Sequence, residues 1–249
     1  MKIAEYQRNF ALEKKYWWFV SVREMVWTLL SLDMDTSRLG KVLDVGCGTG
    51  ALLDELRARA DEVWGLDVSP EALAFCQQRG HERLVQADAT RLPFPDGAFD
   101  VVTAIGVIEH LKDDESFIRE LARALKPGGA LVLLTSSFPF LWSLHDVANE
   151  HRRRYYLRPL RKRLEAAGLK TIRFSHLNFF LFPALAAALV THRWLNGLNS
   201  DQPMRMLPIP PAPINRLLQA VLLVEAWLMK RVTLPWGISM IGLFRKVRQ

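Results

Sequence analysis

The sequence predicts an α/β fold with a doubly wound, mostly parallel sheet, and three observations carry this prediction. Apolar runs of strand length alternate with stretches of helical periodicity between residues 41 and 134. A glycine-rich turn, Gly46-Cys47-Gly48-Thr49-Gly50, joins the first strand of this series to its first helix. Strands in the series run into acidic residues, which in a parallel sheet places those carboxylates along one edge. A chain of 249 residues with 50% hydrophobic content can bury the core of one such domain.

The predicted elements follow one another in the order that this sheet requires. Residues 41–44 form the first strand, and the helix after the turn has an apolar face of Leu52, Leu53, Leu56 and Ala60. Ser69 and Pro70 suit the N-cap and the first position of the next helix. The remaining strands are predicted at residues 63–67, 84–89, 98–105, 130–134, 169–174 and 238–245.

A carboxylate, Asp44, lies two residues ahead of the glycine turn and restricts the ligand that the turn can hold. Glycine permits positive φ and lets a ligand approach the backbone without an intervening Cβ. A dinucleotide fingerprint, G-x-G-x-x-G, directs amides at a pyrophosphate, which a carboxylate would repel. Here the pattern is G-x-G-x-G, and Asp44 suits a cationic ligand such as the ammonium and sulfonium of S-adenosylmethionine. Asp67, at the end of the second strand, is placed to accept ribose hydroxyls.

With these motifs the chain resembles the class I S-adenosylmethionine-dependent methyltransferases, in the group that methylates small molecules and lipids. The resemblance covers roughly residues 40 to 136 and includes the loop Ile105-Gly106-Val107-Ile108-Glu109-His110-Leu111 and the turn Lys126-Pro127-Gly128-Gly129. It implies a Rossmann-like, seven-stranded sheet with an antiparallel last strand. Glycine turns also occur in oxidoreductases and in folds without a cofactor, so a nicotinamide-dependent oxidoreductase stays open as an alternative.

The resemblance also implies a set of cofactor-binding residues. The glycine motif would hold the methionine part, Asp67 the ribose, Val68 the adenine, and Asp88 the exocyclic amine. An N-terminal helix often caps the active site in similar enzymes, and Arg23 would then offer its charge to the cofactor carboxylate. The expected cofactor-binding residues are Asp44, Gly46, Cys47, Gly48, Gly50, Asp67, Val68, Ala87, Asp88, Ala89, Ile105, His110, Tyr16, Trp17 and Arg23.

We predict four parts along the chain: an N-terminal helical cap at 1–38, the S-adenosylmethionine-binding core at 39–176, a hydrophobic helical insertion at 177–236, and the last core strand at 237–249. The insertion holds an apolar run at 179–190, a proline-rich bridge at 203–213 and a helix at 217–229. The run is shorter than the ~20 residues that span a bilayer, and Glu225 interrupts the later helix, which argues against a spanning hairpin. A lid over a lipophilic substrate, a membrane-surface anchor, a homodimer interface and simple packing on the domain stay open.

The chain has 33 Lys and Arg against 26 Asp and Glu, a net charge of +7, and much of the excess lies in residues 151–163. Anionic lipid headgroups, a diphosphate on the substrate or a solvated helix face explain this run. Nucleic acid is not predicted, because enzymes that methylate nucleobase amines carry Asn or Asp with Pro-Pro-aromatic where this chain has Ala104-Ile105-Gly106-Val107. Cys47 and Cys76 give no disulfide framework, and no secretory signal is visible, so we expect a cytoplasmic protein, with peripheral contact at the inner membrane face as a further option.

Methyl transfer from a sulfonium needs alignment more than proton chemistry, because the donor is already activated. A hydroxyl acceptor benefits from a general base, and His145, His151 and His110 are the candidates, of which the first two are favoured. Zinc-type spacing is missing, so no metal is expected. The sequence therefore predicts a methyltransferase that acts on a lipophilic or carrier-linked small molecule at oxygen. A non-catalytic, membrane-associated scaffold with the same fold is the alternative from another class.

Overall fold

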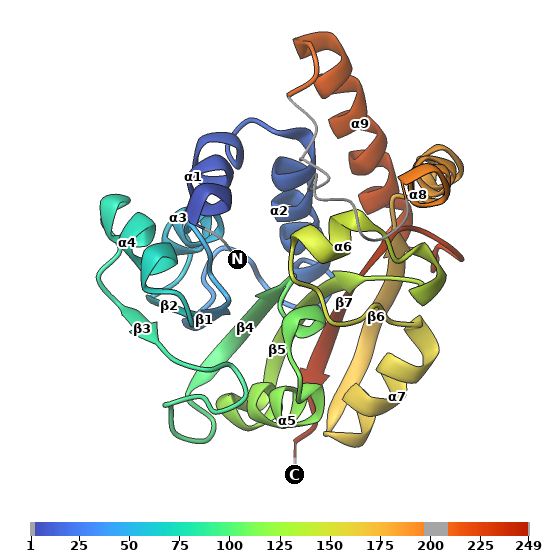
Figure 1. Ribbon diagram of the computed structural model, residues 1–249. Helices are drawn as coiled ribbons and strands as arrows, with labels where there is room; N and C mark the ends of the chain where they lie inside the picture. Colours follow the sequence, from blue (N-terminus) through green and yellow to red (C-terminus); the bar gives the residue numbers. More distant parts are fainter. Residues whose placement is uncertain (1–2, 197–208, 249) are drawn as a thin grey trace.

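The computed structural model describes residues 3–196 and 209–248, and a seven-stranded sheet of order β3-β2-β1-β4-β5-β7-β6 lies at their centre (Figure 1). The strands are β1 Lys41–Val45, β2 Glu62–Asp67, β3 Leu84–Gln86, β4 Phe99–Ile105, β5 Leu125–Ser136, β6 Leu169–Leu177 and β7 Ser239–Lys246. The first five are parallel, and β7 lies antiparallel between β5 and β6. The predicted α/β fold, with its antiparallel last strand, is confirmed.

Helices on both faces of the sheet make the fold doubly wound. They are α1 Ile3–Leu12, α2 Trp17–Leu30, α3 Ala51–Arg57, α4 Pro70–Gln78, α5 Asp114–Ala124, α6 Leu144–Ala148, α7 Leu157–Ala166, α8 Phe182–Asn196 and α9 Ala212–Met229, with the 3-10 turns η1 Ile108–His110 and η2 Pro139–Leu141. The predicted start of α4 is confirmed: the Ser69 hydroxyl caps the helix by accepting a hydrogen bond from the Ala72 amide (3.3 Å), and Pro70 occupies the first turn.

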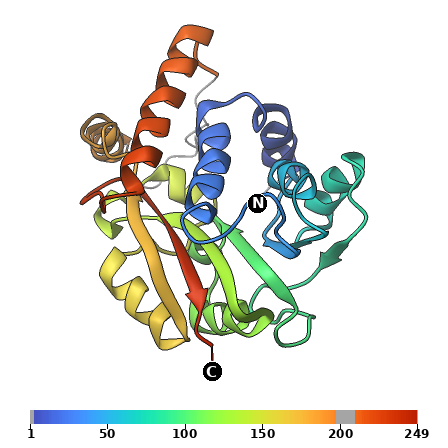
Figure 2. The ribbon, with the colours of Figure 1, turned by 180° about the vertical axis from the view of Figure 1, so that it is seen from behind.

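Two hydrophobic clusters fix which helix covers which face. On one face, α2, α3 and α9 pack their buried side chains against Val42, Val101 and Leu243 of the sheet. On the other face, α5 and α7 pack against Leu43 and Val102. Figures 1 and 2 show α2 and α9 side by side, and the two helices are in contact. Alternate strand residues therefore belong to two separate hydrophobic cores, as expected for a sheet that is buried on both sides.

Several predicted boundaries shift for local reasons. The third strand ends at Gln86, because Asp88 folds back to accept hydrogen bonds from the amide and hydroxyl of Thr90, both at 2.8 Å. Helix α9 begins at Ala212, five residues earlier than predicted, because Pro213 is compatible with a first helical turn. Residues 203–208 of the predicted proline-rich bridge lie outside the described residues.

The predicted N-terminal cap and insertion each divide into two parts. Helix α1 lies beside α4, where Phe10 and Phe75 are in ring contact at 4.9 Å, whereas α2 belongs to the core under the sheet. The inward face of α9 also joins that core, but no described side chain of α8 is buried. By length and composition alone α9 is apolar enough to cross a membrane, and only 22% of it is buried.

Candidate functional site

The candidate site lies where strand order reverses, between the carboxyl ends of β1 and β4. Ligands bind at this switch point in doubly wound sheets. The turn after β1 and the loop after β4 meet here: a Cβ built on Gly46, which has φ +71°, would lie 2.4 Å from Cγ2 of Val107. Only glycine permits that approach, so Gly46 is fixed by the packing of the two loops.

Asp67 connects the end of β2 to the glycine turn. Its Oδ2 accepts a hydrogen bond from the Gly48 amide (3.0 Å), and its Oδ1 accepts one from the Ser69 amide (3.0 Å). The carboxylate is buried, and burial raises its pKa, against the lowering effect of these amides. Both oxygens keep further lone pairs, so the carboxylate can also accept hydroxyls of a ligand.

The backbone beside these groups is open at Gly48. A Cβ built on Gly48 would meet nothing within 4 Å, although the backbone around it is tightly bonded. Val68 follows Asp67 and is 67% exposed, an apolar side chain that could flank a flat aromatic base. Ala87 donates its amide to the Asp67 carbonyl (3.2 Å), which brings residues 87–89 to the same edge, with Asp88 exposed and Ala89 buried.

Asp44 lies beneath the turn and is buried. Its Oδ1 accepts a hydrogen bond from the Thr103 hydroxyl on β4 at 2.6 Å. Burial raises the pKa of Asp44 to about 7, the Thr103 hydrogen bond lowers it, and the nearby charge of Asp67 adds to the rise. A cation at this edge would favour the ionised form, so the residue is suited to a positively charged ligand.

Cys47 is a small buried residue of the turn, as its position suggests. Its Sγ lies 3.8 Å from Sγ of Cys76, and both thiols are free. The Cys76 thiol also donates to the Gly48 carbonyl (3.3 Å), so the pair braces the turn against α4. At the other end, Gly50 adopts φ +87° as the N-cap of α3.

The N-terminal residues predicted to face the cofactor are engaged elsewhere in this structure. Arg23 pairs with Glu55 (2.5 Å) and donates to the Glu13 carbonyl (2.7 Å). Tyr16 is buried, and the Trp17 amide donates to Oδ1 of Asn215 on α9 (3.0 Å). Their predicted contacts with the cofactor stay predictions.

Tyr6, which the sequence pattern did not single out, lies closer to the candidate site. It is buried, its hydroxyl is hydrogen-bonded with Ser69, and burial followed by the charge of Asp67 raises its pKa. Helix α1 therefore covers the edge where Asp67 lies. The signal in the sequence is weak, because a single tyrosine on an amphipathic helix does not reveal which surface it covers.

The three candidate histidines come together around Asp146. Nδ1 of His151 lies 2.9 Å from Oδ1 of Asp146, which also accepts from Nε of Arg154 at 2.7 Å. The rings of His110 and His151 meet edge to face with centroids 4.7 Å apart, and those of His145 and His151 are 6.2 Å apart. The loop after β4 thus meets the segment after β5 at this cluster.

The cluster distinguishes between the candidate bases. Burial alone would raise the pKa of Asp146, but the hydrogen bonds from His151 and Arg154 hold it well below its usual range. An ionised Asp146 makes Nδ1 of His151 the donor and leaves Nε2 as the acceptor. Burial lowers the pKa of His145 to about 4, which makes it a weak base near neutral pH. Burial also lowers the pKa of His110.

Glu109 is a further buried carboxylate that the sequence pattern did not single out as a site residue. Its Oε2 accepts from the Thr135 hydroxyl (2.8 Å), and its backbone carbonyl accepts from the Arg152 amide (2.7 Å). It holds the loop after β4 against β5 and against the segment that carries His151. Within the described residues, no group of three or more His, Cys, Asp or Glu could hold a metal ion.

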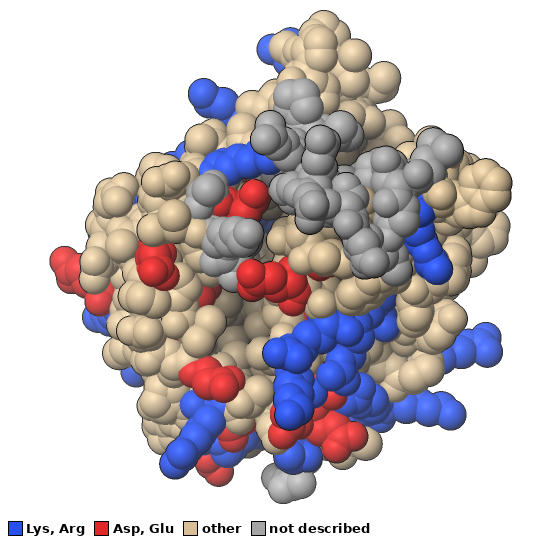
Figure 3. Space-filling view, in the orientation of Figure 1, with Lys and Arg blue, Asp and Glu red and all other residues tan. Residues whose placement is uncertain are grey.

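The basic run at 151–163 is partly structural. Arg154 is buried against Asp146, and Arg153 and Arg163 both bind Asp114 (3.3 and 2.5 Å). Figure 3 shows Lys and Arg side chains gathered on the α7 side of this face, beside a hollow at its centre. Much of the charge that the sequence offers to an anionic partner is therefore neutralised within the fold.

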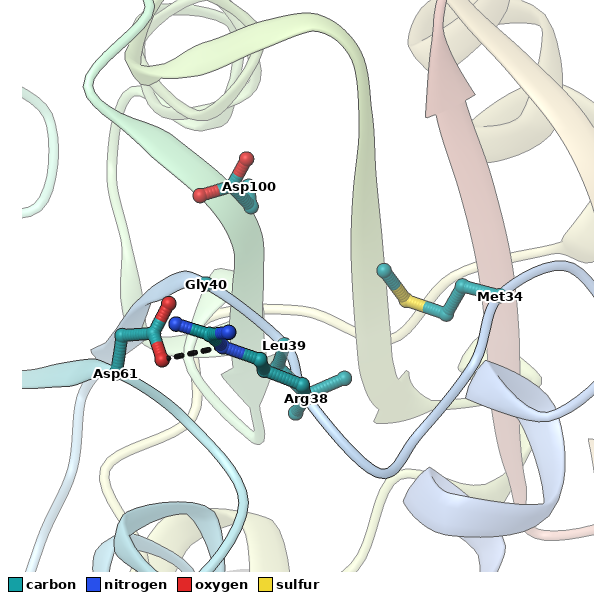
Figure 4. Close-up of a pocket in the computed structure, with 6 residues that line it drawn as sticks. All are labelled: Met34, Arg38, Leu39, Gly40, Asp61 and Asp100. Carbon is teal, nitrogen blue, oxygen red and sulfur yellow. Dashed lines mark hydrogen bonds and ion pairs between the residues drawn. The ribbon is translucent and has the colours of Figure 1, made fainter.

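A surface hollow of about 340 Å³ lies at the opposite edge of the sheet (Figure 4). It is lined by Met34, Arg38, Leu39, Gly40, Asp61 and Asp100. These residues precede or begin β1, β2 and β4, and Arg38 and Asp61 form an ion pair across it (2.8 Å). Because ligands of parallel sheets bind at the carboxyl ends of strands, we assign this hollow no part in the candidate site.

Comparison with known proteins identifies the domain that carries this geometry. Residues 43–133, from β1 to β5, match the family described as "Methyltransferase domain". This stretch is a class I methyltransferase domain. The cofactor of that class is S-adenosylmethionine, and the glycine turn, Asp67 and the loop after β4 all lie within the matched residues.

Curated relatives agree with the assignment of the methyltransferase domain, and a solved structure shares its fold. The chain is 41% identical over 119 residues to a demethylmenaquinone methyltransferase of Thermus thermophilus, covering 45% of this chain and 54% of that protein. It is 36% identical over 131 residues to a ubiquinone biosynthesis O-methyltransferase of Xanthomonas oryzae, covering 48% and 55%. The chain thus spans about half the length of these curated relatives. A chain of the "Complex between the Haloferax volcanii Trm112 methyltransferase activator and the putative methyltransferase" shares the fold, with a TM-score of 0.64 at 18% identity and coverage of 99% and 96%.

Proposed function

We propose that the protein transfers the methyl group of S-adenosylmethionine to a hydroxyl oxygen of a lipophilic or carrier-linked small molecule, in the cytoplasm. The observation that carries the choice of oxygen is the His151–Asp146 pair beside His110 in the loop after β4. A hydroxyl must lose its proton as it is methylated, and an imidazole held by a carboxylate is suited to accept that proton.

In this proposal some residues bind the cofactor and others accept the proton of the acceptor. When bound, S-adenosylmethionine supplies an activated methyl group on a sulfonium. Asp67 would accept the ribose hydroxyls, and Asp44 would lie near the positive charge. Asp146 keeps the Nδ1–H of His151 pointed at itself, so Nε2 would take the acceptor proton as the new oxygen–carbon bond forms.

Aromatic side chains beside the cluster support a lipophilic acceptor. The ring of Phe138, which follows β5, is stacked on His176 (4.9 Å between centroids) and contacts Phe140, Tyr156 and Phe182 (5.3 to 6.1 Å). Phe140 and Tyr156 are exposed. The names of the two curated relatives refer to demethylmenaquinone and to ubiquinone biosynthesis, and both quinones are lipophilic.

The test is transfer of labelled methyl from S-adenosylmethionine to two acceptors with the same alkyl tail, one a phenol and the other an amine. We expect methylation of the phenol, and we expect His151→Gln to lower kcat about 100-fold or more. His145→Gln serves as the matched control and should cause a much smaller loss. Calorimetry with S-adenosylhomocysteine should give wild-type affinity for both variants, which would confirm that they keep the cofactor site.

Two results would contradict the proposal. Exclusive methylation of the amine would contradict transfer to oxygen and, with it, the role of His151 as general base. Unchanged kcat in His151→Gln, with the phenol as acceptor, would show that the imidazole takes no proton.

A further inference from the structure

The outward face of α9 is apolar except for Arg216, near its start. The exposed positions of the helix are Ala212, Pro213, Ile214, Arg216, Leu217, Ala220, Leu223, Val224 and Trp227. Leu217 is 63% exposed and Trp227 is 54% exposed. A helix at a water surface normally turns polar side chains outward and apolar ones inward. The outward face of α9 therefore has the composition of a surface that contacts an apolar phase.

Two polar residues of α9, Asn215 and Glu225, are buried and point the other way. Oδ1 of Asn215 accepts from the Trp17 amide (3.0 Å), and its Nδ2 donates to the Lys15 carbonyl (2.9 Å). Oε1 of Glu225 accepts from the Phe180 amide (3.0 Å), and the side chain is fully buried. These two side chains attach α9 to the start of α2 and to the turn after β6. Apart from Arg216, whose charge suits an anionic surface, the polarity of α9 is thus inverted relative to a water-facing helix.

Helix α8 has the same character without any buried face. Residues 182–190 are all apolar, including Pro183, and none of them is buried. Trp194, in the last turn, is 87% exposed. A helix that is apolar all round is normally covered by protein or by lipid. Figures 1 and 2 show α8 beside α9 at the end of the molecule that lies away from α5 and the C-terminus.

Basic residues border this apolar surface, and acidic ones are nearly missing from its sequence. Residues 178–236 contain five Lys and Arg against two acidic residues. Of these two, Glu225 is buried facing inward, and Asp201 lies outside the described residues. Arg193 precedes Trp194, and the Arg231 guanidinium lies 4.6 Å from the centroid of the Trp227 ring. Tryptophan beside arginine or lysine is typical of side chains at the boundary between lipid tails and headgroups.

We propose that the outward faces of α8 and α9 dock on the surface of an anionic lipid membrane. The apolar side chains enter the boundary between headgroups and acyl chains, and Arg193, Lys230 and Arg231 contact the phosphates. This surface is named the α8–α9 face below. Spanning is not part of the proposal, because α9 is held to α2 through Asn215 and α8 is too short.

A second copy of the chain fits the α8–α9 face less well. The commonest dimers place the same patch of each subunit against the other. Arg193, Lys230 and Arg231 would then meet the basic residues of the other copy, with no exposed acidic side chain on the described part of either face. Like charges brought together at an interface oppose association. Anionic lipid supplies the missing negative charge.

Docking would also bring the aromatic group around Phe138, proposed above to face a lipophilic acceptor, close to the lipid. Phe182, in the first turn of α8, contacts Phe138 at 5.9 Å between ring centroids, and Phe138 belongs to the aromatic group beside the histidine cluster. A lipophilic acceptor could then enter from the membrane without crossing water. The docking itself does not depend on the reaction, so it can be tested without cofactor or acceptor.

The experiment is flotation of the full chain with vesicles of phosphatidylcholine alone or of phosphatidylcholine with phosphatidylglycerol at three to one. The two variants are Val224→Glu, on the α8–α9 face, and Val247→Glu, near the C-terminus at the far end of the molecule. The two valines are matched, because the residues are 50% and 49% exposed. We expect the wild type to bind the anionic vesicles, about tenfold weaker binding to the neutral ones, and about tenfold weaker binding of Val224→Glu. Val247→Glu should bind as the wild type does.

The outcomes distinguish membrane docking through the α8–α9 face from a general charge effect and from dimer formation. Equal loss of binding in both variants would show a general charge effect and overturn the proposal. Failure of the wild type to float with anionic vesicles would also overturn it. Sedimentation of the wild type as a dimer that Val224→Glu converts to a monomer would assign the face to a second copy instead. Thermal unfolding of both variants, measured alongside, should give midpoints close to that of the wild type. Arg231→Gln should lower binding to the anionic vesicles in a protein with Val224 intact.

Discussion

Asp146 holds His151 and Arg154 through a single carboxylate oxygen, with Nδ1 of His151 at 2.9 Å and Nε of Arg154 at 2.7 Å. The second oxygen accepts from the amide of Ser143 (2.8 Å), which makes Asp146 part of the N-terminal capping box of α6. One buried side chain therefore begins a helix, neutralises an arginine and orients the candidate base. The fold and the proposed chemistry share this residue.

Replacing Asp146 should destabilise the protein in a pH-dependent way. Asp146→Asn leaves Arg154 buried without its counter-charge, so we expect the free energy of unfolding to fall by about 3 to 5 kcal/mol at pH 7. The pKa of Asp146 is lowered in the fold, so its stabilisation is present above the usual aspartate pKa of about 3.9 and is lost as pH falls below that value. Urea unfolding at pH 7 and pH 3 should show a smaller difference between variant and wild type at pH 3. An equal difference at both values would contradict this account.

Asp67 should contribute strongly to cofactor affinity. Asp67→Ala removes two acceptors for the ribose hydroxyls and releases the amides of Gly48 and Ser69, so we expect S-adenosylhomocysteine to bind about 100-fold more weakly. Asp61→Ala is the control, because Asp61 lies at the opposite edge of the sheet in the hollow of Figure 4. Calorimetry should show that Asp61→Ala binds S-adenosylhomocysteine with wild-type affinity. Similar losses in the two variants would place the ribose elsewhere.

The sequence predicted the parts of the site that depend on neighbouring residues. Ser69 and Pro70 indicate a helix start, and the residues involved, from Ser69 to Ala72, span only four positions. The glycine turn after an apolar strand indicates the edge of the sheet at which a ligand binds. Ser143 and Asp146 form a capping box at the same short range, and this local signal indicates that Asp146 is committed to α6, although the prediction of candidate bases did not use it.

The parts that the sequence could not predict depend on contacts between distant residues. Arg79 meets Glu13 across 66 positions, and Asn215 meets Trp17 across 198. Periodicity reports only which face of a helix is apolar, and α2 satisfies that rule whether it caps the site or packs under the sheet. In the fold α2 packs against α9 and the sheet, and no local pattern records these long-range contacts.

Asp44 should couple cofactor binding to pH. Because its pKa is raised to about 7 in the fold, the stability associated with its protonated form is present at low pH and is lost as pH rises through 7. Asp44→Asn keeps a similar shape without that titration. We expect its gain in stability over the cofactor-free wild type to grow by about 3 kcal/mol between pH 5 and pH 8. Chemical unfolding at the two pH values measures the change, and a constant difference would argue against a titrating Asp44.

The same residue should distinguish a charged from a neutral ligand. S-adenosylmethionine carries a sulfonium that S-adenosylhomocysteine lacks, so Asp44→Asn should weaken binding of the first more than of the second. In the wild type the affinity for S-adenosylmethionine should rise with pH through 7, and calorimetry in buffers of different ionisation enthalpy should detect proton release. Equal weakening of both ligands would mean that Asp44 acts through Thr103 and not through its charge.

Arg79 connects the helix over the site to the glycine turn. Its Nε donates to the Thr49 carbonyl (2.7 Å), its Nη1 pairs with Asp54 (2.9 Å), and its Nη2 pairs with Glu13 just after α1. The guanidinium also lies 4.4 Å from the centroid of the Phe10 ring. One nearly buried side chain thus binds the covering helix, the turn and α3 at once.

We therefore expect Arg79→Ala to loosen α1 and to weaken cofactor binding together. Hydrogen exchange should accelerate in residues 3–12, and the affinity for S-adenosylhomocysteine should fall about tenfold, because Tyr6 no longer stays over Asp67. Arg79→Lys keeps the charge but cannot make all three contacts, so it should restore only part of the affinity. Arg57→Ala is the control, since Arg57 makes one exposed hydrogen bond to the Gly80 carbonyl (2.9 Å). If exchange in α1 is as slow in Arg79→Ala as in Arg57→Ala, the covering helix is held by its packing on α4 and not by the arginine.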